Sequence, residues 1–507
     1  MRSRHTSPTR LLLLIIAALL CASATARADE EDQYEPDEYD ETARVVRVSL
    51  MRGEVSLRRA GNIEWEPARL NIPLVEGDTL ATGRDARVEI QFDAYNFVRV
   101  GEQSVLSVVT LREEGAALSI SEGTATLRLA RFDRAREYFE LDAPKSTVSA
   151  ETKGLYRVDV GRDGDVRVTV RDDGRARVYS ETSGFLLRSG RTARLAYDTF
   201  ADGDWEISQA AAFDDWDAWN DERERHLAVL LRYENRERYY DADIYGAEEL
   251  DTYGDWVHQE PYGWVWRPRA SVVSQYPDWA PYRHGHWAWC PPYGWTWVPD
   301  EPWGWAPYHY GRWVYVNDNW CWVPRAYGRR HGRAWWRPAL VVFVKIVLRT
   351  GRHLGRHPGT HIAWYPLGYG HRDPHSRNYR RGRHDRHERR PLDPVRGSEA
   401  ANIIRRNPEL MRAVTILREQ EFGTQRARPA PTDLAQRAMT GEPVQGRLPI
   451  RPADLERLDA RGEGGRGPTV PARTVGAGGR ADGDSSREGL TIIRPARVAP
   501  PRDIPRR

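Results

Sequence analysis

The sequence predicts a mainly β protein, and three features of the chain support this fold class. In residues 43–200, apolar and polar residues alternate in short runs, as in strands with one buried face. Asp-Gly pairs separate several of these runs and are typical of hairpin turns. Further on, a Tyr-Gly-Trp-x-Trp-x-Pro pattern repeats, and its Trp-x-Trp spacing puts both indoles on one side of a strand.

Residues 1–28 have the pattern of a secretory signal peptide. Arginines precede the apolar run Leu11–Leu20, and Ala26-Arg27-Ala28 is a small-x-small cleavage site. An apolar run of this length is too short to cross a bilayer as a helix. We therefore expect an exported protein, periplasmic or at the cell surface or extracellular, without a transmembrane span after cleavage. The acidic residues 29–42 are predicted to be a disordered leader.

Residues 43–200 are predicted to form a β domain. Val88, Ile90 and Phe92 alternate with polar residues. A turn at Asp163-Gly164 separates two further alternating runs, and Asp173-Gly174 marks a second turn.

The motifs of this domain occur in a recognisable order. They are Gly53-Glu54-Val55, Trp65, Glu76-Gly77-Asp78, Thr82-Gly83, Ala86–Phe92, Val98–Gly101, Phe139–Pro144, Gly154–Val160, Val166–Val178 and Ser189-Gly190. The segment Arg44–Tyr197 resembles the FecR domain, a periplasmic β-rich module named for a ferric-citrate regulator. The resemblance implies an envelope location and the sensing of a protein or ligand, not catalysis. Such regulators carry a cytoplasmic anti-sigma segment before a membrane span, whereas here only Met1–Arg10 precede the apolar run, which speaks against a sigma-factor role.

Residues 205–250 are predicted to be a charged helical linker packed between domains. The helical pattern runs from Ser208 to about Glu237, and its apolar stripe comprises Phe213, Trp216, Trp219, Leu227, Leu230 and Leu231.

Residues 251–370 are predicted to form a Trp-rich domain of short β repeats. The stretch Tyr253–Tyr327 holds thirteen of the twenty tryptophans and no Leu, Ile, Met or Phe. Its copies begin at Trp256, Trp287 and, one residue shorter, at Trp313. With Arg337–Val344 and Ala363–Gly368, this section resembles a Trp-rich family of unknown function that often follows a FecR domain in secreted bacterial proteins.

The aromatic rings of this domain have two interpretations. Indole faces can stack on sugar rings, so a ladder of them suits a polymer such as peptidoglycan or another envelope polysaccharide. Because the stretch has no Leu or Ile, the same rings must also supply the core. Both hold if one ring of each pair is buried and Trp303 or Trp305 is open. The candidate ligand-binding residues are Trp303, Trp305, Trp279, Trp264, Trp295 and Trp320.

Cys290 and Cys321 remain after signal cleavage, and in an oxidising compartment we predict either a disulfide between them or two buried free thiols. His353, His357 and His361 are spaced by four, but nearby glycines and prolines oppose a helix, so we predict no metal site. There is no Walker loop, nucleophile elbow or His-Glu-x-x-His motif. We accordingly predict no cofactor and no catalytic residues.

Residues 371–507 are rich in Arg, Pro and Gly and are predicted to be a largely disordered tail with short helices at Ser398–Arg406, Asp433–Met439 and Ala453–Asp459. Export removes nucleic acid as the usual partner of its arginines. The sequence thus predicts a non-enzymatic binding or scaffold protein of the cell envelope, with a glycan or an envelope protein as its partner. The alternatives are a FecR-type periplasmic sensor and a cryptic glycan hydrolase.

Overall fold

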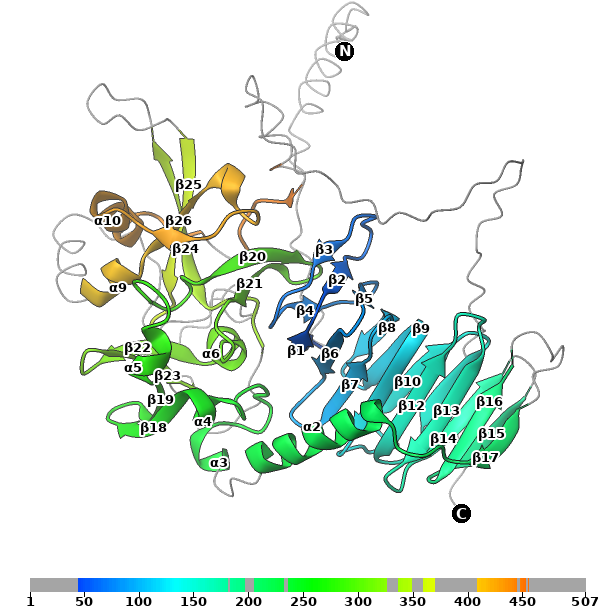
Figure 1. Cartoon of the computed structure of the whole chain (residues 1–507). Coiled ribbons are helices and arrows are strands. Elements are labelled where there is room, and N and C mark those ends of the chain that lie inside the picture. The colour runs from blue at the N-terminus through cyan, green and yellow to red at the C-terminus, as the bar shows by residue number, and fades with distance from the viewer. Residues whose placement is uncertain are drawn as a thin grey trace, which may run out of the picture. The chain divides into compact units, whose positions relative to one another are not determined.

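The protein is described by a computed structural model over residues 44–180, 183–196, 205–231, 236–325, 336–348, 359–369, 408–444, 447–452 and 455. Over these residues the fold is mainly β with short helices, as predicted (Figure 1). The predicted signal peptide, the predicted acidic leader and the predicted helix Ser398–Arg406 lie outside the described residues. No helix in the described ranges is long and apolar enough to cross a membrane.

The first seventeen strands form a β domain of two sheets that share the long strand β9. The first half of β9 pairs with β8 and, in parallel, with β10, whereas its second half pairs with β7 and β12. Gly123 lies at this change of sheet with a φ of +90°, and a Cβ there would lie 2.1 Å from Oγ of Ser104. Only glycine fits such a position without strain. The strands are β1 Val46–Arg52, β2 Val55–Arg58, β3 Glu66–Pro67, β4 Pro73–Leu74, β5 Thr79–Thr82, β6 Arg87–Gln91, β7 Asn96–Val100, β8 Val105–Arg112, β9 Gly115–Leu129, β10 Tyr138–Ala143, β11 Ser146–Ala150, β12 Gly154–Val160, β13 Val166–Arg171, β14 Arg175–Ser180, β15 Gly184–Arg188, β16 Arg191–Leu195 and β17 Glu206–Gln209.

The two predicted turns behave differently. Asp163-Gly164 joins β12 and β13 in an antiparallel hairpin, as predicted. The turn at Asp173-Gly174 instead carries the chain from one sheet to the other, because β14 pairs with β11 and β15 and not with β13. The alternating apolar residues of both sheets face each other in one core.

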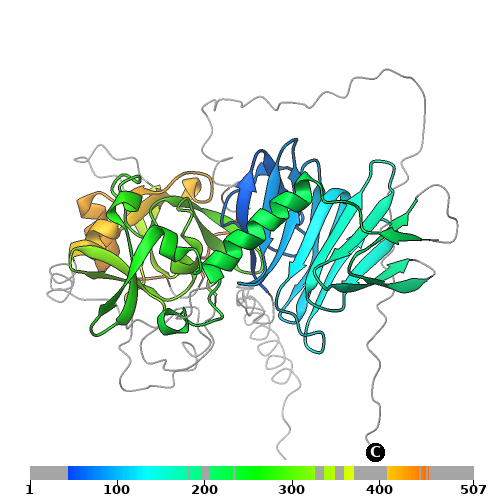
Figure 2. The same ribbon diagram turned by 60° about the horizontal axis from the view of Figure 1, so that its bottom comes forward.

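Helix α2, Asp215–Leu231, lies across the β domain (Figure 2). It begins later than predicted, because Glu206–Gln209 form β17 instead. The sheet beneath it presents charged residues. Glu89 is fully buried between Arg99 and Arg223, at 2.8 Å from each. Although burial opposes ionisation, these two arginines hold the pKa of Glu89 at about 2. The helix is therefore held by a buried charge network as well as by Leu227 and Leu230.

The Trp-rich part contains three hairpins, two further strands and short helices. The first and third hairpins join in one sheet of order β18-β19-β23-β22, and the second hairpin stands as a separate pair. The elements are α3 Arg236–Tyr239, α4 Leu250–Tyr253, β18 Gly254–Gln259, β19 Gly263–Pro268, α5 Ala270–Val273, β20 Gly285–Cys290, β21 Gly294–Pro299, α6 Trp305–His309, β22 Arg312–Val316, β23 Asn319–Val323, β24 Val341–Leu348 and β25 Gly359–Pro366.

Part of the predicted tail belongs to this fold, which corrects the boundary expected at residue 370. Strand β26 adds to the edge of β25, and Ile416, Phe422 and Leu434 are at most 4% exposed in the aromatic core. The predicted helix at Asp433–Met439 is present, whereas Ala453–Asp459 lies almost wholly outside the described residues. The elements are α9 Pro408–Ala413, β26 Thr415–Arg418, the 3-10 helix η2 Glu419–Glu421, β27 Arg428–Pro429 and α10 Thr432–Thr440.

The β domain and the Trp-rich part share buried contacts. Val298 of β21 packs in the core of the β domain, while Trp297 beside it packs in the aromatic core. Arg47 of β1 is 1% exposed and donates to Gln91 Oε1 (2.7 Å), Asn71 Oδ1 (2.6 Å) and Glu249 Oε1 (2.9 Å). We call this group of four residues the Arg47 junction. It joins the first strand of the β domain to the residue that precedes α4.

Candidate functional site

The three hairpins place their aromatic residues in the same register. In each hairpin, a Trp on one strand lies directly opposite a Trp on the other strand. These pairs are Trp256–Trp266, Trp287–Trp297 and Trp313–Trp322. We call these the inner pairs. The outer pairs lie two positions nearer to each turn. They are His258–Trp264, Trp289–Trp295 and Tyr315–Trp320. All three outer pairs have ring centroids 5.4 Å apart at interplanar angles of 67–80°. The sequence repeat is therefore a structural repeat.

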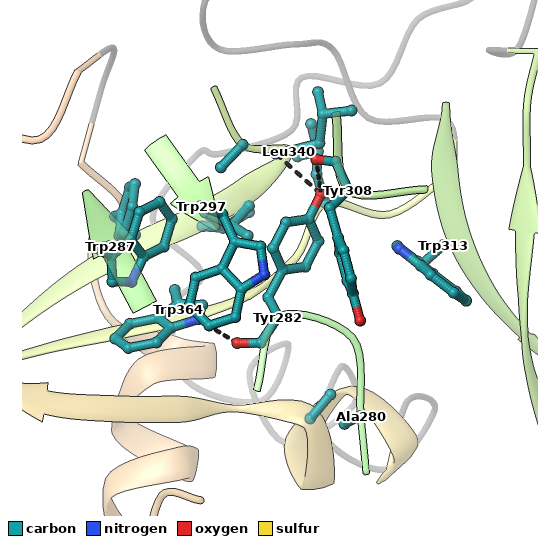
Figure 3. Packing of buried hydrophobic residues seen from close by; sticks show 14 of the residues in the cluster. Ala280, Tyr282, Trp287, Trp297, Tyr308, Trp313, Leu340 and Trp364 are labelled. Carbon is teal, nitrogen blue, oxygen red and sulfur yellow. Dashed lines mark hydrogen bonds between the residues drawn. The ribbon is translucent and has the colours of Figure 1, made fainter. Parts of the chain in front are cut away.

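The inner pairs build the core. Their rings are at most 2% exposed, except for the half-buried Trp256. Figure 3 shows Trp297 between Tyr282 and Trp287, and Trp287 also packs against Trp364. Tyr282 accepts the Trp364 indole N–H at its backbone oxygen (2.9 Å), and its hydroxyl donates to the backbone oxygen of Tyr308 (2.8 Å). Edge-to-face contacts between such rings add to the stabilisation from their buried area.

Trp303 and Trp305 are both fully buried, so neither is the open ring that the sequence led us to expect. Trp303 packs between Trp266 and Tyr308, with centroid distances of 5.1 and 5.9 Å. Trp305 begins α6 and packs against His309 at 4.6 Å. Both fill the interior because the stretch has no aliphatic side chains of similar size. Their faces are occupied by protein.

Trp279 is half-buried and is held by a carboxyl group inside the core. Its indole N–H donates to Glu301 Oε1 (2.8 Å), which also accepts the Tyr308 hydroxyl (2.7 Å). Glu301 is fully buried, and Oε2 has no hydrogen-bond partner among the described residues. Burial raises the pKa of Glu301 to about 8, even though both donors favour the charged form. Glu301 is therefore protonated at neutral pH and acts as a structural acceptor for Trp279.

This raised pKa predicts a pH-dependent stability. The unfolded carboxyl loses its proton near its ordinary pKa of 4.5, whereas the folded one keeps it up to about 8. The stabilisation is thus complete below pH 4.5 and is lost as pH rises to about 8. Glu301→Gln is expected to raise the melting temperature relative to wild type progressively from pH 5 to pH 8.5, by an amount equivalent to roughly a few kcal/mol at the upper end.

The matched control is Glu260→Gln on the first hairpin, whose side chain is 83% exposed. Its melting temperature should track wild type at every pH. A constant offset between Glu301→Gln and wild type across the range would contradict the raised pKa.

The outer rings differ in how they are covered. Trp320 is 8% exposed, and Trp264 and Trp295 are half-buried. Trp295 donates its indole N–H to the backbone oxygen of Ile450 (2.7 Å). Trp264 has the guanidinium of Arg238 4.4 Å from its ring centroid. Of the six predicted binding residues, Trp264 is thus the half-buried outer ring of the first hairpin, and its neighbours Tyr239 and Arg238 come from outside the hairpins.

In two hairpins, an inner and an outer Trp together hold an aromatic side chain from another segment, stacked on the inner ring and edge-on to the outer one. We call this arrangement an aromatic clamp. In clamp 1, Tyr239 of α3 stacks on Trp256 at 4.8 Å and 8° and meets Trp264 edge-on at 5.1 Å and 78°. In clamp 2, Phe422 stacks on Trp287 at 5.4 Å and 18° and meets Trp295 at 4.9 Å and 88°. Tyr239 and Phe422 carry no sequence signal of this role, because neither belongs to the repeat.

Of the two alternatives predicted for Cys290 and Cys321, the structure has the second, because both are buried free thiols, and they lie in different sheets. Cys290 accepts a hydrogen bond from Arg59 Nη2 (3.6 Å) on the β domain, and Cys321 packs with Val265, Val314 and Val323. Burial raises the pKa of both thiols, that of Cys321 to about 11. Such thiols react slowly.

The fully buried His309 also lies in the aromatic core. Burial lowers its pKa to about 3, so it is neutral. Its Nδ1 lies 2.7 Å from the backbone oxygen of Arg337. In the described part of the chain, no three His, Cys, Asp or Glu side chains are grouped as a metal site would need.

Comparison with known proteins bears on the hairpin region. Residues 247–371 match a family of unknown function (DUF6600). Comparison with the curated proteins gives no match. Two crystal structures of "a putative anti-sigma factor from Parabacteroides distasonis ATCC 8503" are similar at 15% identity. One has a TM-score of 0.23 over 26% of this chain and 60% of that chain, and the other 0.24 over 38% and 99%. The FecR resemblance of Arg44–Tyr197 stays a prediction, whereas the part that carries the aromatic hairpins is similar to the DUF6600 family.

Proposed function

We propose that this chain is an exported, non-enzymatic binding protein of the cell envelope that holds a polysaccharide on the first hairpin. The observation that carries this proposal is the partial exposure of adjacent rings there. Trp256, Trp264 and Tyr262 are half-buried, and His258 is about half exposed at 51% of its side chain. Indole and phenol faces exclude water from the C–H faces of sugars, while Arg238 and His258 can bond hydroxyl groups. The secretory pattern of residues 1–28 supports the envelope as the compartment.

The polymer nature of the ligand follows from the small size of this surface. A few half-exposed rings on one hairpin make a weak contact by themselves. A polymer offers such a weak site many equivalent sugar units at high local concentration, so a molecule that leaves one unit can rebind at the next. Peptidoglycan and extracellular polysaccharides have this repeating character.

Replacing Trp264 with alanine is expected to abolish retention of the mature protein on isolated peptidoglycan or on an immobilised envelope polysaccharide, because the central stacking face is lost. Co-sedimentation and a glycan array measure this. Trp65→Ala is the matched control, since Trp65 is 44% exposed and likewise carries an arginine, Arg58, 4.9 Å from its ring centroid. Circular dichroism and melting curves verify that both variants fold.

Three results would count against the proposal. Wild type that binds no polymer in either assay, or a folded Trp264→Ala protein that binds as wild type does, would overturn the assigned ligand or surface. Release of soluble sugar fragments during incubation would replace the non-enzymatic function with the hydrolase alternative.

The Arg47 junction favours the sensor alternative as a second candidate. It connects the FecR-like β domain to α4, which directly precedes the first hairpin. A ligand on that hairpin would then alter hydrogen exchange in β1, whereas a passive binder would show protection on the hairpin alone.

A further inference from the structure

Clamp 2 is filled by a segment that lies far along the chain from the hairpins. The family match ends at residue 371, while Phe422 belongs to residues 408–444. The two clamps accept aromatic side chains from unrelated segments, one before and one after the matched region. The clamp is thus a receptor site for an aromatic side chain supplied from outside the hairpins.

The segment 408–444 contacts the Trp-rich part in the way that a peptide ligand would. Its strand β26 extends the β24–β25 hairpin in an antiparallel register from His361–Arg418 to Trp364–Thr415. Adding a strand to a sheet edge is a common mode of peptide binding. Phe422 is fully buried in the clamp, and Gly423 follows it. A Cβ at Gly423 would lie 2.7 Å from the Trp295 ring, so the backbone lies directly on the indole.

Polar contacts at the rim fix the position of the segment. Lys345 Nζ lies 2.8 Å from Glu419 Oε1, and Arg426 Nη2 lies 3.5 Å from Asp300 Oδ2. Arg283 also donates to the backbone oxygen of Arg412. The surface therefore has a strand edge, an aromatic pocket and matching charges for this one segment.

The chain between the two parts is long. Residues 370–407, thirty-eight positions, separate Tyr369 from Pro408. At about 3.3 Å per residue, this length reaches at most roughly 125 Å. A segment on so long a connection can reach a neighbouring molecule. The contacts that it makes with clamp 2 of that molecule are identical to those that it makes with clamp 2 of its own chain. Binding within one chain and binding between two chains differ only in the conformational entropy of residues 370–407, and this entropy changes slowly with the length of the connection.

We propose that residues 408–444 are a donor segment and that clamp 2 with the edge of β25 takes the same segment from a second copy of this chain. Two copies exchange their segments and form a reciprocal dimer. High local protein concentration favours this dimer, because the neighbouring segment then competes with the connected one. The proposal is independent of the polysaccharide ligand.

Two mature full-length variants test it, His361→Cys and Arg418→Cys, each with a different affinity tag. These positions face each other across β25 and β26, and directly paired residues in an antiparallel sheet lie close enough for a disulfide. The variants are unfolded, mixed at high concentration, refolded together and oxidised with glutathione disulfide. We expect a disulfide-linked species of twice the chain mass that carries both tags and is absent when either variant is refolded alone.

A single chain with both substitutions is the geometric control and should form the bond internally. If it does so while the mixture yields only monomers, the exchange between copies is refuted. If it forms no bond, the strand pairing beneath the proposal is wrong.

A second comparison tests the aromatic side chain itself. Adding Phe422→Ala to the Arg418→Cys chain should lower the yield of the linked species by about tenfold or more, because a large buried side chain is lost. Gln425→Ala, on an exposed residue of the same segment, should leave the yield unchanged. An equal yield with Phe422→Ala would remove the clamp from the interaction.

Discussion

Replacing Trp266 with alanine is expected to lower the free energy of unfolding by about 3–5 kcal/mol. Trp266 is fully buried, donates its indole N–H to the backbone oxygen of Leu250 (3.0 Å) and packs 5.1 Å from Trp303. A Cβ on Gly254 would lie 2.4 Å from the Trp266 ring, so the backbone packs directly against the indole. Removing the indole therefore leaves a cavity and takes one of two hydrogen bonds from the Leu250 carbonyl, which still accepts the Gly254 N–H. Urea unfolding followed by circular dichroism measures the loss.

Trp264→Ala is the matched control, two residues away on the same face of the same strand. Its half-exposed ring should contribute about 1–2 kcal/mol. A loss as large as that of Trp266→Ala would show that the outer ring belongs to the core. Equal and small losses would instead show that the hairpins are held by their backbone pairing and not by the inner rings.

The hairpins could be predicted from sequence because strand periodicity and turn residues are local properties. The Trp-x-Trp spacing required both rings to share a face, and Tyr-Gly and proline marked the turns. The choice between inner and outer ring could not be predicted. Trp264 and Trp266 point to the same side, and only the pairing of Trp266 with Trp322 of another hairpin makes one of them interior.

The other differences between the sequence prediction and the structure arise where the conformation or burial of one segment is set by contacts with a segment far away in the sequence. Strand β26 has only four residues and is a strand because β25 offers it an edge. Its sequence, embedded among Arg and Pro, resembles a tail. Trp303 and Trp305 looked suitable for a ligand because their motif is less regular than the hairpins, yet both are fully buried, Trp305 as the first residue of α6 and Trp303 two residues before it. Burial of this kind is set by tertiary packing and not by local pattern.

The burial of the charged residues is the feature that the sequence indicates least. Arg47, Glu89 and Arg99 would each be placed on a solvated strand face from the sequence, and all three are at most 1% exposed. Their partners come from α2 and from residues just before α4. These charges therefore specify how the linker region and the Trp-rich part attach to the β domain, a task that apolar surfaces alone perform with less geometric selectivity.

Replacing Arg47 with methionine is accordingly expected to destabilise the protein by about 3–5 kcal/mol, because removing one partner of a buried ion pair leaves the other charge uncompensated. The loss should fall toward the lower end of this range, since the Glu249 side chain is 25% exposed. Gln91 and Asn71 would also lose the donor to their amide oxygens. Chemical unfolding measures the change, and Arg52→Met, at the exposed end of the same strand, should have little effect.

The pairing itself is tested by adding Glu249→Gln to the Arg47→Met protein. Burial raises the pKa of Glu249 to about 7, with Arg47 as the main influence that lowers it. Once Arg47 is gone, the carboxyl becomes a half-buried, poorly solvated group without a countercharge, and its ionisation above neutral pH opposes folding. The neutral amide removes that cost, so the double variant should be more stable than Arg47→Met alone at pH 8, and the two losses should not add. Strictly additive losses would show that Arg47 acts through packing against Trp305, 5.6 Å from its guanidinium, and not through the charge that joins the two parts of the chain.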